Sequence, residues 1–206
     1  MAIPCKLCEK KRARRHCPGV GGEICPVCCG TERENSIDCP LDCEYLREAR
    51  QFERPAVLSE GDIPNQDIRV SEQFIREHEH QVTWLTIALT RAMEKEKAVD
   101  LDAREALDAL VRTYRTLKSG LIYETRPQNL YAAAIQQALQ QAIEDLGKQM
   151  AEESGMQTLR DSDVLGTLVF LQRLEMQHSN GRRRGRAFLD FLRNYFPAPS
   201  AVSLQA

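Results

Sequence analysis

The sequence predicts a mainly helical protein with a small zinc-binding module at its N-terminus. All eight cysteines fall between Cys5 and Cys43 of the 206-residue chain, in a stretch where apolar residues are sparse. From residue 67 onward there is no cysteine, and apolar residues recur three and four positions apart, as on one face of a helix. We therefore expect a metal-held segment followed by a helical domain that has its own hydrophobic core.

Composition sets limits on the class of protein. The chain has 28 Lys and Arg against 30 Asp and Glu, which argues against a chain built wholly for nucleic acid. With 42% hydrophobic and 28% charged residues, wholesale disorder is excluded. The sequence has no apolar run of membrane-spanning length, and its first fifteen residues lack the apolar core of a secretory signal. We expect a cytoplasmic protein with no membrane or small-molecule partner.

The cysteine spacing predicts two zinc ions, because eight thiols in a reducing compartment are better explained as metal ligands than as four disulfides. Zn²⁺ prefers four soft ligands in a tetrahedron, and a two-residue spacer lets one turn supply two of them. A hairpin closed by the glycine-rich turn at 18–22 would bring the second Cys-x2-Cys pair back to the first. This predicts a first site made of Cys5, Cys8, Cys25 and Cys28.

The remaining cysteines predict a second site, interleaved with the first. Pro40 suits the first turn of a helix with Cys39 as its cap, so Cys39 and Cys43 should lie on one helical face. Cys17 and Cys29 would complete the set, with His16 as an alternative ligand to Cys17. An iron–sulfur cluster or a redox dithiol is the alternative to zinc.

This pattern resembles the treble-clef and cross-brace zinc fingers, of which RING, MYND and HIT fingers are examples. The resemblance covers about a fifth of the chain. The missing histidine ligands and the adjacent Cys28 and Cys29 depart from those families, so the resemblance implies no activity such as ubiquitin transfer. With four protein ligands, each ion would stabilise folding and would not activate water.

The domain boundaries follow the change in composition. We expect the module over 1–52, a linker over 53–66, a helical domain over 67–197 and a fraying tail over 198–206. Apolar stripes and capping residues predict helices over 67–98, from a cap at Asp100 to just before Pro127 with Leu121 in the stripe, from Tyr131 to near Gly155, from a cap at Asp161 or Ser162 through Leu174, and from Gly181 to Phe196. Short connections between long helices predict an up-and-down bundle of four to five helices.

Two basic clusters are candidate contact surfaces. One lies between Lys6 and Arg15, where the cations either offset thiolate charge or face a phosphate or partner. The other comprises Arg182, Arg183, Arg184 and Arg186, which either start a solvated helix or bind an anionic group.

The helical region also contains Glu77-x-x-His80 and Glu175-x-x-His178, a pairing found in di-iron carboxylate bundles. No phosphate-binding loop, nucleophile elbow or catalytic cysteine–histidine pair is visible outside the zinc cluster. The sequence therefore favours a non-enzymatic zinc protein that acts as a macromolecular interaction or adaptor module, with a protein partner or self-association. The alternatives are a nucleic-acid-binding regulator and a di-metal (iron or manganese) oxidoreductase.

Overall fold

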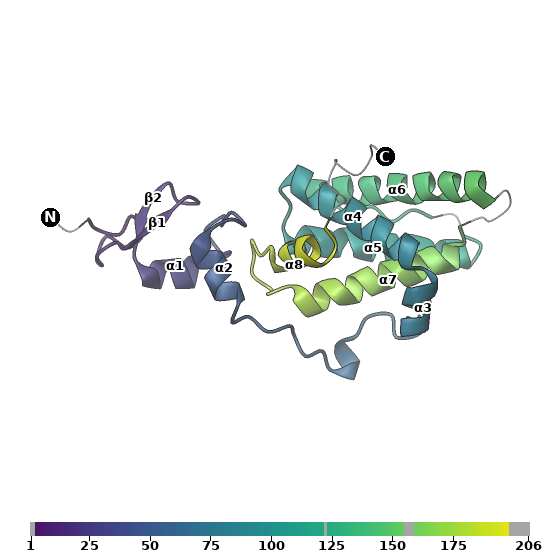
Figure 1. Cartoon of the computed structure of the whole chain (residues 1–206), viewed down its shortest axis with the longest axis horizontal. Coiled ribbons are helices and arrows are strands. Elements are labelled where there is room, and N and C mark those ends of the chain that lie inside the picture. The colour runs from purple at the N-terminus through teal and green to yellow at the C-terminus, as the bar shows by residue number, and fades with distance from the viewer. Residues whose placement is uncertain (1–2, 122, 155–158, 198–206) are drawn as a thin grey trace, which may run out of the picture.

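The computed structural model describes residues 3–121, 123–154 and 159–197, so the predicted tail over 198–206 lies outside the described residues. The described part is mainly helical and carries one hairpin, as predicted. A small module occupies one end of the long axis and a helical bundle the other (Figure 1). The elements are β1 Arg15–Cys17, β2 Gly22–Ile24, α1 Pro26–Glu32, α2 Glu44–Arg50, the 3-10 turn η1 Glu60–Asp62, α3 Glu72–Glu77, α4 Glu79–Glu96, α5 Asp100–Lys118, α6 Leu130–Ser154, α7 Asp161–His178 and α8 Ala187–Tyr195. Within the described ranges, every helix is too short or too polar to cross a membrane.

The hairpin forms where the glycine-rich turn predicts it. Strands β1 and β2 pair antiparallel, with Arg15 opposite Ile24 and Cys17 opposite Gly22. Gly21 has a φ of +61°, and a Cβ on Gly19 would lie 2.5 Å from the Asp38 carbonyl oxygen. The turn therefore requires glycine at both positions.

Helix α1 was not predicted. Cys25 is its N-cap and accepts a hydrogen bond from the backbone N–H of Cys28, while Pro26 occupies the first helical position. Proline suits that position because its missing N–H would have no partner there anyway. The Cys25-Pro26 pair is the signal that could have predicted this helix.

Helix α2 begins later than predicted. Its N-cap is Cys43, and the Cys43 N–H donates to the Pro40 carbonyl to close a turn ahead of the helix. Cys39 lies outside the helix, so the prediction that Cys39 and Cys43 share one helical face is wrong. Pro40 opens a turn here and does not begin a helix.

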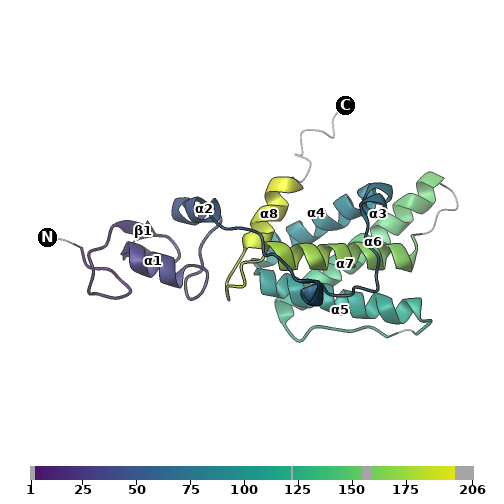
Figure 2. The ribbon, with the colours of Figure 1, turned by 90° about the horizontal axis from the view of Figure 1, so that it is seen from below.

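Helices α4, α5, α6 and α7 form a four-helix bundle, and α8 packs across one end of it (Figures 1 and 2). Each helix contributes a fully buried leucine to the shared core: Leu85, Leu107, Leu139 and Leu168. The single helix predicted over 67–98 is divided, since α3 ends at Glu77 and α4 starts after His78.

The bundle differs from an up-and-down bundle at its middle connection. Helix α5 ends at Lys118, and Leu121 is 63% exposed rather than part of the apolar stripe. The Asn129 side chain donates to the Asp102 carboxylate at 2.5 Å, which places the start of α6 beside the start of α5. The two helices therefore run parallel. Residues 119–129 can return along α5 because eleven extended residues span about 36 Å, against about 28 Å for a 19-residue helix.

Asp100 caps a different helix from the one predicted. Its carboxylate accepts the backbone N–H groups of Phe188 and Leu189, at 3.0 and 3.3 Å, and so caps the start of α8. The start of α5 is capped by Asp102, which accepts the Val99 N–H at 2.8 Å. Burial raises the pKa of Asp100 to about 7, although the two N–H donors act in the opposite direction.

The predicted linker is an ordered segment that crosses the bundle. The Ala56 N–H donates to the carbonyl of Gln177 on α7 at 2.8 Å. The Arg173 guanidinium of α7 donates to the carbonyls of Pro64, Asn65 and Ile68. These contacts hold the segment against α7, so it does not act as a free tether.

Candidate metal centre

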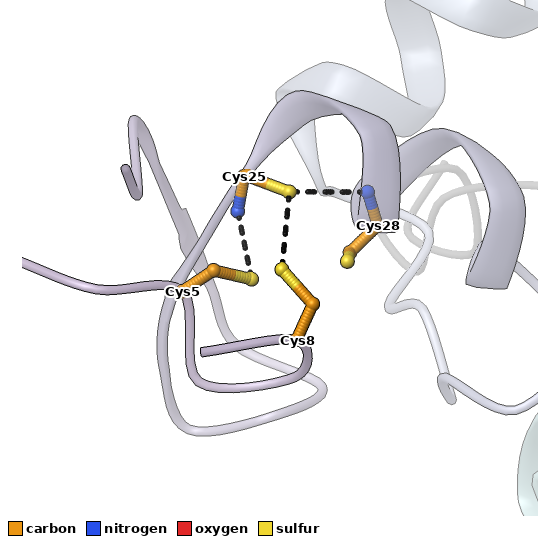
Figure 3. Close-up of side chains that lie close together, drawn as sticks. All are labelled: Cys5, Cys8, Cys25 and Cys28. Atoms are coloured by element: carbon orange, nitrogen blue, oxygen red, sulfur yellow. Dashed lines mark hydrogen bonds between the residues drawn. The ribbon is translucent and has the colours of Figure 1, made fainter. Parts of the chain in front are cut away.

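The first predicted site is formed. The sulfur atoms of Cys5, Cys8, Cys25 and Cys28 all lie within 4.8 Å of one another and turn toward a common centre (Figure 3). The first pair comes from the turn that follows residue 4, and the second from the start of α1. The hairpin between them brings the two pairs together, as the spacing predicts. Cys5 and Cys25 are buried, whereas Cys8 and Cys28 are half-buried.

Backbone N–H groups favour thiolates at this centre. Burial raises the pKa of Cys5, but N–H donors from Cys25, Cys8 and Leu7 outweigh burial and bring it down to about 6. The N–H groups of Lys10 and Lys11 lower the pKa of Cys8 in the same way. Thiolates are the form that binds a metal.

The neighbouring thiols oppose full ionisation in the absence of a cation. The hydrogen bond with Cys25, followed by burial, raises the pKa of Cys28 to about 12. Four like charges in so small a volume repel one another, and a divalent cation at the centre would remove that penalty.

The geometry fits one tetrahedral ion. Sulfurs placed 2.3 Å from a zinc ion are about 3.8 Å apart in a tetrahedron, and the Sγ atoms of Cys8 and Cys25 are 4.0 Å apart. The group can therefore hold a metal ion such as zinc. An iron–sulfur cluster would place its own iron and sulfide atoms between the thiolates and needs a wider set.

The other four cysteines surround one small cavity. Cys17 from β1, Cys29 from α1 and Cys39 are buried, and Cys43 at the start of α2 is half-buried. All four line a space of about 10 Å³, and the predicted alternative ligand His16 lines it too. The rest of the lining is Arg15, Ile24, Arg33, Ile37, Tyr45 and Leu46. Burial raises the pKa of Cys39, a hydrogen bond from the Glu34 backbone partly opposes this, and the charges of Glu34, Cys17 and Cys43 add to the rise. These sulfurs do not form a second group with all distances below 4.8 Å.

Cations of the module lie beside this second set. The Arg15 guanidinium donates to the Cys29 sulfur at 3.4 Å and stacks on the Tyr45 ring, and Arg33 lies 3.9 Å from the same sulfur. The His16 side chain is 69% exposed and its Nδ1 lies 3.2 Å from the Glu23 carboxylate. Cys17 is buried, so it is better placed than His16 to be the ligand from β1.

Three of the four arginines in the second basic cluster lie at the junction between module and bundle. Arg182 donates to the Arg33 carbonyl at 2.6 Å. Arg186 lies 2.5 Å from the Asp38 carboxylate, and Arg184 lies 3.9 Å from the same group. Arg183 is exposed. These three arginines thus contact the chain's own N-terminal module, and their predicted role with an external anion remains a prediction.

Glu34 is the central residue of this junction, and the sequence analysis missed it. It is fully buried between α1 and Cys39, with its backbone at a φ of +53°. Its carboxylate accepts the Arg50 guanidinium at 2.7 Å, the Asn180 amide at 2.8 Å and the Arg186 N–H at 3.0 Å. One charge therefore joins α2 of the module to the segment that precedes α8.

The Glu-x-x-His pairs do not come together. His78 Nε2 lies 3.5 Å from Asp163, which places the start of α4 beside the start of α7. Glu175 is twelve residues farther along α7, or about 18 Å. Its carboxylate is fully buried and accepts both Nε and Nη2 of Arg104, at 2.8 and 3.1 Å. The di-metal site expected from these pairs is therefore not formed in the described part of the chain.

No protein-family model matches the chain, and neither a curated protein nor a solved structure matches it.

Proposed function

We propose that the protein is a non-enzymatic zinc protein that binds another macromolecule through its N-terminal module. The observation that carries this proposal is the closed four-thiol group at Cys5, Cys8, Cys25 and Cys28. Four protein ligands leave no coordination position for water or a substrate, so the ion would hold the module's fold. The turn that carries Cys5 and Cys8, the β1–β2 hairpin and the start of α1 together support a treble-clef type of module.

A second zinc ion between Cys17, Cys29, Cys39 and Cys43 is part of the proposal. The four side chains face one cavity, three of them are buried, and Arg15 and Arg33 lie close enough to offset thiolate charge. Such an ion would tie β1, α1 and the start of α2 together. Without it, this end of the module has only Ile24, Ile37 and Leu46 as a buried apolar core.

The surface beside the first site is suited to a partner. Leu7 lies inside the first ligand pair and Val27 inside the second, and they are 42% and 51% exposed. Both are therefore held next to the ion by its own ligands. The bundle lies at the opposite end of the long axis and leaves this end of the module free (Figure 2). Exposed apolar side chains on a rigid support are typical of interaction surfaces.

The test uses the full-length chain with Leu7→Asp and Val27→Asp together, and Leu130→Asp on α6 as the control. Leu130 is 84% exposed and belongs to the bundle. Metal content and thermal stability of each variant establish that the module is folded. We expect partners that co-purify with the wild type in quantitative mass spectrometry, or self-association measured by sedimentation, to be lost in the module variant and kept in the control. Equal behaviour of the two variants would contradict the proposal.

A further inference from the structure

The extended segment from Arg12 to Cys17 sorts its cations onto two faces. Exposure alternates residue by residue: Arg12, Arg14 and His16 are exposed, whereas Ala13 and Arg15 are half-buried and Cys17 is buried. Alternation of this kind follows from the pleat of an extended strand. The half-buried Arg15 donates a hydrogen bond to the Cys29 sulfur and lies over the Tyr45 ring. The exposed Arg12 and Arg14 lie on the opposite face of the segment from Arg15.

The outward cations have no anionic partner among the described residues. Lys10, Lys11, Arg12 and Arg14 are exposed and form no ion pair there. Arg15 and Arg33 contact the Cys29 sulfur, whereas no such contact is formed by the side chains of these four within the described residues. We call Lys10, Lys11, Arg12 and Arg14 the cationic strip.

Charge is distributed unevenly along the molecule. Residues 1–24 carry six Lys and Arg against two Glu, whereas residues 25–206 carry 22 Lys and Arg against 28 Asp and Glu. The strip therefore lies at the positive end of an otherwise acidic protein, and that end is remote from the bundle (Figure 1). Such an asymmetry favours an anionic partner at residues 1–24 over one at the rest of the chain.

We propose that the cationic strip binds the phosphate backbone of a duplex nucleic acid. This inference rests on the proposed function, since it names the partner of the same end of the module. A duplex presents one negative charge for about every 1.7 Å of its axis, which suits mobile cations along an extended segment. Proteins that bind single strands stack the bases on aromatic rings, and residues 1–44 contain no Phe, Trp or Tyr. We therefore expect the strip to recognise the charge of the phosphate backbone and not the bases.

The test measures the affinity of the zinc-loaded full-length protein for a 20-base-pair DNA duplex, by fluorescence anisotropy across a salt series. Four phosphate contacts predict a slope of log K against log salt of about −3.6, or a loss of about 150-fold between 50 and 200 mM salt. Arg12→Gln with Arg14→Gln should halve the slope to about −1.8. The matched control removes the same charge at two other exposed residues, Arg69 before α3 and Arg112 on α5, and should bind as the wild type does.

Three results would overturn the inference. These are no binding at 50 mM salt, equal slopes for the strip variant and the control, and a preference of tenfold or more for one separated strand over the duplex. In each of these cases, a partner lost with Leu7→Asp and Val27→Asp would still support the proposed interaction function. The two proposals can therefore fail separately.

Discussion

Replacing Glu34 with glutamine should release the N-terminal module from the bundle. The Glu34 carboxylate is fully buried, and the Arg50 side chain that it binds is only 9% exposed. Arg50 Nη1 lies 2.9 Å from Asp190, but neither Nη1 nor Nε has a well-aligned hydrogen-bond partner. The second carboxylate thus compensates poorly for the loss of the first. Removal of one member of a buried ion pair costs about 3–5 kcal/mol.

This cost should appear at the junction and leave the bundle core unchanged. The Arg184 N–H donates to the Glu34 carbonyl at 2.7 Å, and the Arg186 N–H donates to its carboxylate. Hydrogen exchange of peptides that cover 180–186 should therefore accelerate about 140- to 3700-fold if exchange occurs through local opening, since 1.4 kcal/mol is a factor of ten. Peptides from the middle of α5 should exchange as in the wild type.

The control for charge is Glu48→Gln, because Glu48 is exposed on α2 of the same module. The double variant Glu34→Gln with Arg50→Gln leaves no uncompensated buried charge and should recover part of the loss. An exchange rate at 180–186 that changes less than tenfold in Glu34→Gln would refute the reasoning. Acceleration of the whole bundle by the same factor would also refute it.

Three further predictions concern the bundle and the metal. Because the pKa of Asp100 is about 7 in the folded state against an ordinary 3.8, the folded state keeps a proton that the unfolded state loses. The wild type should therefore lose stability relative to Asp100→Asn, by up to about 1.4 kcal/mol per pH unit, as pH rises from 4 to 7 in urea titrations. Gly166→Ala should destabilise by about 1–3 kcal/mol in the same assay, because its Cβ would lie 2.5 Å from the Phe74 ring; Gly147→Ala, with only an ordinary contact to Leu159, should not. Chelation of the metal should accelerate hydrogen exchange before residue 50 and leave α4 to α7 protected; protection before residue 50 that survives chelation would contradict a structural metal.

The features predictable from sequence were those set by local pattern. Two Cys-x2-Cys pairs on either side of a glycine-rich turn can meet only if the chain folds back, and the structure brings Cys5, Cys8, Cys25 and Cys28 together in this way. The apolar stripes located the helices of the bundle to within a few residues in most cases. Both kinds of pattern depend on residues close in the chain.

The features missed were those decided by tertiary contacts. A rule based on short loops cannot show that residues 123–129 run back along α5 and leave α6 parallel to it. The local sequence predicts that Asp100 caps the helix that follows it. Its carboxylate instead accepts the N–H of Phe188 at the start of α8, 88 residues away. Glu34 carries no sequence signal, because its three partners lie 16, 146 and 152 residues away in the chain.

The most direct test of this account is the metal content of the purified, reduced, full-length protein, measured by elemental analysis beside two variants. We expect two zinc ions per chain in the wild type. Cys17→Ser with Cys39→Ser should retain one ion at the first site, and Cys5→Ser with Cys8→Ser should lose it. Iron in place of zinc, or a wild-type chain that holds no metal, would contradict the central claim that zinc builds the module.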